Sequence, residues 1–217
     1  VPVKFVWTHD AFRVGEDGPT HEPVEQEAQI RLMEKLQNHA GKDSVRVFRP
    51  ADADETTVCW AMAMENTETP TALIFSRQGI AKLPAGNDYE MARKGAYIVA
   101  GSDENPDVIL VASGSEVSTL EAGTEALRKD GIKVRVVSAP SEGLFRRQSA
   151  EYQESVLPAN MTAGLPVTLE GLVGIGPNSR IYGMKSFGFS APYKVLDEKL
   201  GYTGENVYKQ VKDFLKK

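Results

Sequence analysis

The sequence contains very little cysteine. Cys59 is the single cysteine among 217 residues, so no disulfide can form within the chain, and we expect a protein of the reducing cytoplasm. Basic residues are not in excess either, because 25 Lys and Arg stand against 30 Asp and Glu, for a net charge of −5. A nucleic-acid-binding domain usually carries a positive excess, so nucleic acid is not an expected partner.

Long apolar segments are missing as well. No apolar run approaches the roughly 20 residues that a transmembrane helix needs, and residues 1–7 lack the pattern of a signal peptide. We therefore expect no membrane as partner. The sequence does not begin with Met, which favours a processed start or a portion of a longer protein.

Strand-like and helix-like segments alternate along the first part of the chain. Strands are predicted at 3–7, 44–50 and 71–77, and helices at 24–39 and 51–66. The first helix is given an apolar face by residues at roughly helical spacing, namely Val24, Ala28, Ile30, Leu32, Met33 and Leu36. This order predicts an α/β fold in which a mainly parallel sheet is flanked by helices.

Residues 79–93 are rich in Gly, Pro and Asn, and we interpret them as a linker that ends a first unit, 1–93, before a second unit, 94–217. The second unit is also expected to be α/β. Its predicted strands are 107–113 and 133–140, with weaker candidates at 167–174 and 181–187, and its predicted helices are 115–131 and 204–217. The turn before the first of these helices could bind phosphate, but it lacks a full GxGxxG, and Ser115 as a helix cap is the favoured interpretation.

The segment "THDAFRVGEDGPTHEP", residues 8–23, concentrates groups that handle protons. His9 directly follows a predicted strand, and Asp17 and His21 lie in a turn that glycine and proline make rigid. A histidine near an acid can move a proton close to neutral pH, and the same groups can bind a ligand with many hydroxyls. A solvated connection is the alternative, and a metal site is weakly supported because no third ligand is well placed.

Arg77 ends another predicted strand and is expected at the same sheet edge as His9. Alone it would be taken for a surface arginine, but together the two favour a site for a phosphate or carboxylate. Neither Cys59 nor His39 is expected to belong to a functional site. Cys59 is predicted to lie in the core, and His39 to be a helix-end or surface group.

Several motifs together resemble the transketolase family, and they occur in that family's order and spacing. They are Thr8–Asp10, Gly15–His21, Pro23–Glu25, Arg49–Asp52 and Ser76–Gln78 in the first unit, and Ala112–Val117, Val137–Ser141, Glu154–Pro158 and Phe187–Pro192 in the second. The resemblance covers nearly the whole chain. Arg13 and Glu22 depart from the usual pattern.

The resemblance implies a transferase of the pentose phosphate pathway that moves a two-carbon ketol unit between sugar phosphates. Such enzymes use thiamine diphosphate with a divalent cation, Mg or Ca, and work as homodimers. By resemblance, His21 is the catalytic residue at the reacting carbons, Asp17 binds a substrate hydroxyl, and His9 and Arg77 bind the sugar phosphate. The protein would orient hydroxyls and move protons around the cofactor.

The family's motif for the diphosphate and metal is absent from this sequence, as are its cofactor-activating glutamate and stacking aromatics. We therefore expect residues 1–93 to be the back part of a pyrimidine-binding domain and 94–217 to be a C-terminal domain. On this interpretation an N-terminal part and a second subunit are missing, and the chain alone is inactive and binds no cofactor or metal. The alternatives are part of a deoxyxylulose-phosphate synthase, the β-type subunit of a 2-oxo acid dehydrogenase, or a non-catalytic dimerisation module.

Overall fold

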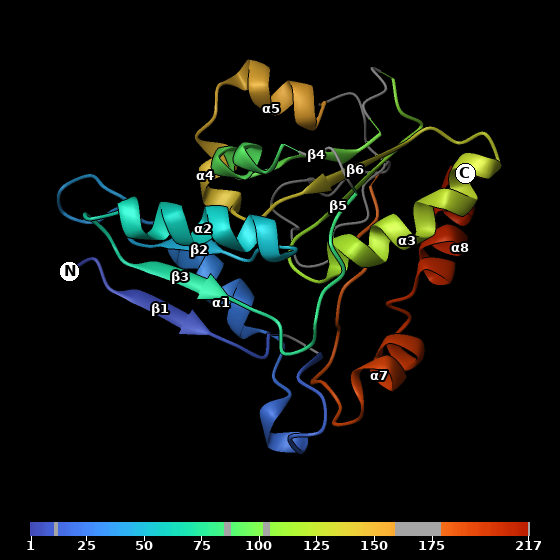
Figure 1. Cartoon of the computed structure of the whole chain (residues 1–217), viewed down its shortest axis with the longest axis horizontal. Helices are drawn as coiled ribbons and strands as arrows, with labels where there is room; N and C mark the ends of the chain where they lie inside the picture. Colours follow the sequence, from blue (N-terminus) through green and yellow to red (C-terminus); the bar gives the residue numbers. More distant parts are fainter. Residues whose placement is uncertain (11–12, 85–87, 102–104, 159–178, 217) are drawn as a thin grey trace.

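A computed structural model describes residues 1–10, 13–84, 88–101, 105–158 and 179–216 (Figure 1). Two three-stranded sheets form its framework, with strand orders β1-β3-β2 and β4-β6-β5. Helices cover these sheets, which confirms the predicted α/β class. Within the described residues, none of the helices has both the length and the apolar character that crossing a membrane requires.

The first sheet is parallel throughout. β1 (Lys4–Trp7) and β2 (Arg46–Phe48) both pair with the central β3 (Thr71–Ile74). All three predicted strands are therefore confirmed. The predicted helix after β2 is α2 (Ala53–Glu65), and the Asp52 carboxylate caps it by accepting a 2.9 Å hydrogen bond from the Glu55 backbone N–H.

The helix after the first loop differs from its prediction. α1 spans Gln26–Met33, shorter than the expected 24–39, and it buries Glu27 and Arg31. Of the apolar residues at helical spacing, Leu32, Met33 and Leu36 are 42–59% exposed, whereas Ile30 packs against the buried cluster that contains Val47. Buried ion pairs of Arg31 also hold this helix in place.

The second sheet is mixed. β5 (Val108–Ala112) runs parallel to β6 (Val134–Ser138), as predicted, whereas β4 (Tyr97–Ala100) is antiparallel to β6 and was missed from the sequence. Residues 181–187 form no strand, so that prediction was wrong, and the candidate strand at 167–174 lies outside the described residues. The expected linker, 79–93, includes the start of a short 3-10 helix, Tyr89–Lys94.

Helices α3 (Glu116–Lys129) and α8 (Gly204–Leu215) pack on one another beside the second sheet (Figure 1). Ser115 occupies the cap position of α3, but its side chain makes no capping hydrogen bond and instead lies 3.1 Å from the Glu116 carboxylate. The remaining α-helices of the described residues are α4 (Glu142–Arg146), α5 (Ala150–Val156) and α7 (Tyr193–Leu200).

One hydrophobic core runs through both units. Phe48 and Leu73 of the first sheet belong to the same buried cluster as Leu110 and Val136 of the second and Val207 of α8. Cys59 is fully buried in this cluster, which confirms its predicted place in the core. Because the two units share a core, each supports the position of the other.

A fully buried carboxyl lies inside this core. Glu55 accepts hydrogen bonds of 2.8 Å from the Tyr97 hydroxyl and the Ala51 backbone N–H. Burial raises the pKa of Glu55 to about 7 despite these hydrogen bonds. The proton is therefore held more tightly in the folded chain than in the unfolded one.

We expect the free energy of unfolding to fall as pH rises from about 4.5 to about 7, because over this range the unfolded chain releases the Glu55 proton while the folded chain still holds it. Glu55→Gln removes this titration. Between pH 5 and 8 the free energy of unfolding, measured with urea, should therefore decrease by about 3 kcal/mol less in this variant than in wild type. Glu125→Gln, at an exposed position of α3, is the control and should leave the pH dependence unchanged. Equal slopes for wild type and Glu55→Gln would contradict the assignment.

Candidate functional site

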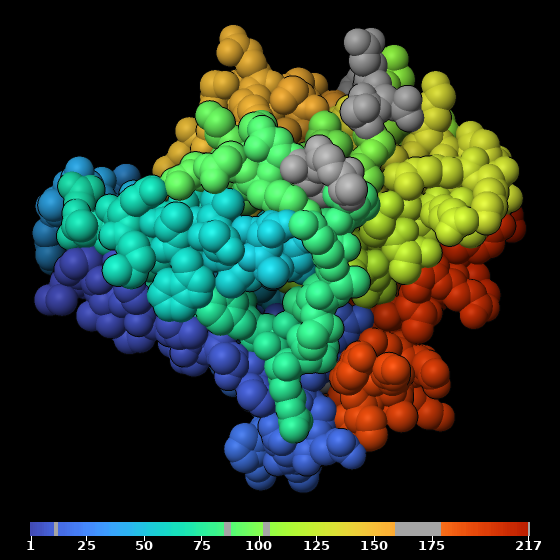
Figure 2. All heavy atoms as spheres, in the orientation of Figure 1, coloured from blue at the N-terminus to red at the C-terminus, as the bar shows by residue number. Residues whose placement is uncertain are grey.

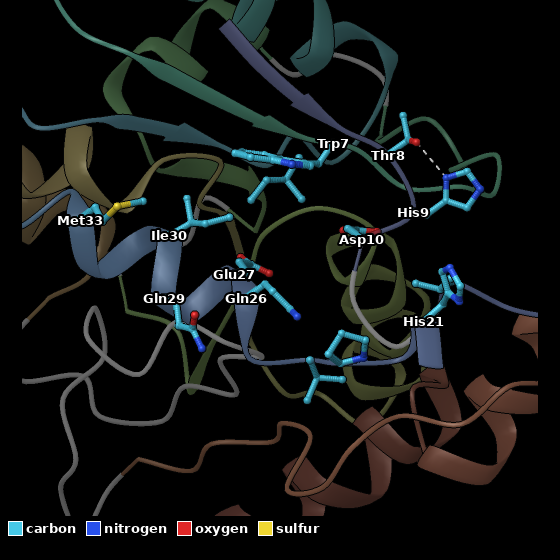
Figure 3. A pocket seen from close by; sticks show the side chains of 14 residues that line it. Trp7, Thr8, His9, Asp10, His21, Gln26, Glu27, Gln29, Ile30 and Met33 are labelled. Carbon is cyan, nitrogen blue, oxygen red and sulfur yellow. Dashed lines mark hydrogen bonds between the residues drawn. The ribbon is translucent and has the colours of Figure 1, made fainter. Parts of the chain in front are cut away.

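A cavity of about 520 Å³ opens where β1 ends and α1 begins (Figure 3). His9 and His21 lie at one end of it, and Trp7, Ile30 and Met33 lie at the other. The other lining residues are Thr8, Asp10, Val14, Pro23, Val24, Gln26, Glu27, Gln29 and Ile74. The carboxyl end of a parallel sheet is where α/β proteins commonly bind ligands, so the cavity has the expected place in the fold.

The two histidines reach this cavity from opposite ends of the 8–23 loop. His9 follows β1 with a φ of 66°, a left-handed backbone conformation that is uncommon for histidine, and its Nδ1 lies 2.9 Å from the Thr8 hydroxyl. His21 ends a single 3-10 turn, Pro19–His21, and its Nδ1 lies 3.0 Å from the Thr20 hydroxyl. Both rings are exposed, so each can reach a bound molecule.

A segment of the second unit holds this loop in place. The Ala191 N–H donates to the Gly15 carbonyl over 3.0 Å, and the Gly18 N–H donates to the Ser190 hydroxyl over 2.9 Å. Figure 2 shows the blue surface of the loop region beside the orange surface of α7. The loop is thus built against the second unit and is more than a solvated connection.

Asp17 and Arg77 form a second group beside the cavity. Arg77 Nη1 donates to the Val14 carbonyl over 2.8 Å and lies 3.2 Å from the Asp17 carboxylate. Gly15 allows this approach, because a Cβ at its position would lie 2.9 Å from Arg77 Nη1. Neither Asp17 nor Arg77 lines the cavity, and among the described residues the structure gives no hydrogen bond between Arg77 and His9.

Glu22, next to His21, is buried, and neither of its carboxylate oxygens makes a hydrogen bond. Burial raises the pKa of Glu22, and the nearby Asp17 raises it further, while His21 acts in the opposite direction. The Gly188 N–H donates to the Glu22 carbonyl over 2.8 Å. The departure at this position therefore places a buried carboxyl with a raised pKa beside the candidate catalytic histidine.

A network of buried charges lies beneath the cavity, and the sequence did not indicate it. Arg49, 1% exposed, lies after β2, and its Nε is 2.6 Å from Asp10 Oδ2 and 3.4 Å from Glu27 Oε2. Its Nη1 donates to the Ser113 carbonyl over 2.6 Å and pairs with Glu116 of α3. Asp10 and Glu27 also line the cavity, so the network and the cavity share a wall.

The titration of these groups follows from their burial. Burial raises the pKa of Asp10, and Arg49 only partly offsets it. Burial also acts to raise the pKa of Glu116, but Arg49 and Arg13 outweigh it and the pKa ends below its usual value. Arg13, a departure noted in the sequence, is 6% exposed and lies 2.6 Å from Asp197 of α7. Charged side chains thus join the loop, α3 and α7.

The described residues contain no group of three or more His, Cys, Asp or Glu that could hold a metal ion. His39 lies in an exposed turn well after the end of α1 and away from the cavity. Burial raises the pKa of the Cys59 thiol well above its usual value, which disfavours a nucleophilic role.

Two family models match the chain. The model for the pyrimidine binding domain of transketolase matches residues 1–82, and the model for the transketolase-like C-terminal domain matches residues 95–203. The chain is 42% identical over 213 residues to the transketolase of Staphylococcus aureus strain MW2, covering 95% of this chain and 31% of that protein. It spans about a third of the length of the curated relatives that it matches.

Solved structures that resemble this chain are also transketolases. The transketolase from Leishmania mexicana superposes with a TM-score of 0.83 at 37% identity, covering 99% of this chain and 30% of that one. The Pichia stipitis transketolase in complex with sedoheptulose 7-phosphate superposes with a TM-score of 0.83 at 34% identity and the same coverage.

Replacing Arg49 tests the buried network. Arg49→Met should lower the free energy of unfolding by about 3–5 kcal/mol, because Asp10 and Glu116 lose the charge that compensates their burial. Arg93→Met, which breaks the exposed pair of Arg93 with Glu65, should cost less than about 1 kcal/mol. Urea unfolding of the 217-residue chain measures both changes. Equal losses of unfolding free energy in the two variants would show that the buried pairs of Arg49 contribute no more to stability than an exposed ion pair.

Proposed function

The chain belongs to the transketolase family, and we propose that it forms the substrate side of an enzyme that transfers a two-carbon ketol unit between sugar phosphates. The observation that carries the proposal is the cavity that His9 and His21 line at the carboxyl end of the first sheet. A relative of the same fold has been solved with a sugar phosphate, sedoheptulose 7-phosphate. The proposed setting is the pentose phosphate pathway in the cytoplasm.

We assign proton handling to His21. Its ring is exposed at the cavity and its Nδ1 is within 3.0 Å of the Thr20 hydroxyl, which leaves Nε2 to face a substrate hydroxyl. An imidazole can both take and return a proton as the hydroxyl and carbonyl of a ketol interconvert. Thr20 would fix the orientation of the ring.

We assign substrate binding to His9, Asp17 and Arg77. Asp17 accepts a hydrogen bond from a sugar hydroxyl, while Arg77, which its pairing with Asp17 and Val14 holds in place, offers its remaining N–H groups to the phosphate. His9 binds the same sugar phosphate from the cavity. His9 and Arg77 share no hydrogen bond in the described structure, and we propose that one sugar phosphate contacts both.

Thiamine diphosphate, when bound, supplies the carbon nucleophile that cleaves the bond between the ketol unit and the rest of the sugar. The cavity fits only part of this cofactor. Trp7, Ile30 and Met33 offer an apolar wall, whereas no described group could hold the divalent cation that accompanies the diphosphate. We propose that other polypeptide holds the diphosphate and its Mg or Ca ion.

Strand β1 supports the need for further polypeptide. It lies at an edge of its sheet, and Phe5, Val6 and Trp7 are 42–44% exposed, although successive residues point to opposite faces. Phe5 and Trp7 stack at 5.5 Å between ring centroids. A strand that is apolar on both faces is typical of the interior of a parallel sheet. We propose that the N-terminal transketolase part and a second subunit cover these surfaces in a homodimer.

His21→Ala in the assembled enzyme should lower kcat by about 100-fold or more for xylulose 5-phosphate and ribose 5-phosphate, because the proton transfer loses its general base. His39→Ala, at an exposed turn away from the cavity, is the matched control and should retain full activity. Steady-state kinetics measures both. Unchanged turnover of His21→Ala would favour a non-catalytic module and contradict the assignment.

Without its partner, the chain should self-associate through β1 and give no heat of binding with thiamine diphosphate in calorimetry. Phe5→Lys places a charge on the exposed apolar strand and should reduce the self-association measured by light scattering. Met64→Lys, at a 65% exposed position of α2, is the control. Tight cofactor binding by the chain alone, or monomeric wild type, would overturn the proposed dependence on further polypeptide.

A further inference from the structure

A second, smaller cavity of about 90 Å³ lies between α1 and α4, and we name it the α1–α4 pocket. It shares no lining residue with the cavity that contains His9 and His21. Basic side chains dominate its lining, which consists of Arg31, Glu34, Lys35, Glu142, Gly143, Arg146 and Arg147. Its volume suits a single small group rather than a whole metabolite.

Arg31 brings an unused donor to this pocket. The side chain is 5% exposed, its Nε lies 2.8 Å from Glu27 Oε1, and its Nη2 donates to the Ser113 hydroxyl over 3.3 Å. Its Nη1 makes no hydrogen bond and lies 3.9 Å from Glu34 Oε2. A buried guanidinium nitrogen without an acceptor costs free energy, which an acceptor placed in the pocket would recover.

Lys35 adds a second donor. Its side chain is exposed, and in the part of the chain that the structure describes its ammonium group has no hydrogen-bond or ion-pair partner. Arg146 and Arg147 lie at the rim, where Arg146 Nε donates to Glu142 over 2.9 Å and Arg147 pairs with Asp43. Arg146 and Arg147 are thus paired with carboxylates. Arg31 and Lys35 each keep N–H groups that can donate to a bound anion.

The carboxylates of the lining do not cancel this arrangement. Glu142 is engaged by Arg146, and Glu34 Oε1 accepts a 3.0 Å hydrogen bond from the Val47 N–H. Burial raises the pKa of Glu34, although Arg31 acts in the opposite direction. Gly143 lets α4 approach closely, because a Cβ there would lie 2.7 Å from Glu34 Oε1.

We propose that the α1–α4 pocket binds one phosphate group, which accepts hydrogen bonds from Arg31 Nη1 and the Lys35 ammonium. A tetrahedral oxyanion suits donors that come from α1 and from the turn that follows it, and a group of this size fits the volume. The group is either free inorganic phosphate or the phosphate end of a larger molecule that extends into solvent. Arg31 pairs with Glu27, and Glu27 pairs with Arg49, so an occupant bound to Arg31 would be linked to the charge network under the main cavity.

Titration of the 217-residue chain with inorganic phosphate, followed by ³¹P NMR and calorimetry at constant ionic strength, tests the proposal. Wild type should bind one phosphate saturably, and Lys35→Gln should weaken this binding by about tenfold, as expected for one charge-assisted hydrogen bond. Lys129→Gln, which changes an exposed lysine on α3, is the charge-matched control and should bind like wild type. Glycerol phosphate in place of inorganic phosphate distinguishes the two sources, because tighter binding of the ester indicates the end of a larger molecule.

Three outcomes would overturn the proposal. These are no saturable binding by wild type, equal weakening by Lys35→Gln and Lys129→Gln, and phosphate binding that Arg77→Gln removes while Lys35→Gln leaves it intact. The last result would place the anion at the loop that carries Asp17 instead. Because Lys35 is exposed and unpaired in the described structure, its replacement is not expected to unfold the chain.

Discussion

The Arg49 guanidinium, enclosed by carboxylates from both units, is the interaction on which the rest of the structure depends. Taking one cation and its anions out of water costs several kcal/mol per ion, and only close geometry with further hydrogen bonds recovers it. The chain provides that geometry through its backbone. The Gly114 N–H donates to the Arg49 carbonyl over 3.0 Å, and a Cβ on Gly114 would lie 2.6 Å from the Arg49 Cζ.

The candidate site inherits its shape from this network. Asp10 comes directly after His9, so the ion pair with Arg49 fixes the chain one residue beyond the unusual backbone of that histidine. Glu27 pairs with Arg49 and Arg31 while it lines the cavity. Buried ion pairs of this kind make the contact between the two units specific, because any other arrangement of the units would leave buried charges without partners. The site is therefore preorganised by groups that do not need to touch a substrate.

The sequence predicted those features whose cause is local. Runs of β-branched residues such as Val108–Ala112 specify strands, and a loop rich in glycine and proline had to be irregular. It could not show that Glu27 and Arg31 are buried, because their partners Arg49 and Ser113 are distant in the chain. The pairing of Arg77 with Asp17 spans 60 residues and was hidden for the same reason. β4 pairs antiparallel with β6, whereas the alternation of strand and helix predicts parallel strands, so that pattern did not indicate it.

The hydrogen bonds between Gly15 and Ala191 and between Gly18 and Ser190 join positions more than 170 residues apart. During synthesis, the loop with His9 and His21 leaves the ribosome long before Ser190 and Ala191. The hydrogen bonds that hold the loop therefore cannot form until these residues have also been made. Contacts of such separation form late, since the entropy of closing the intervening chain must be overcome first. The substrate side of the site is thus synthesised before the residues that hold it, and a nascent chain that has not yet extended past Ala191 cannot hold its histidines in position.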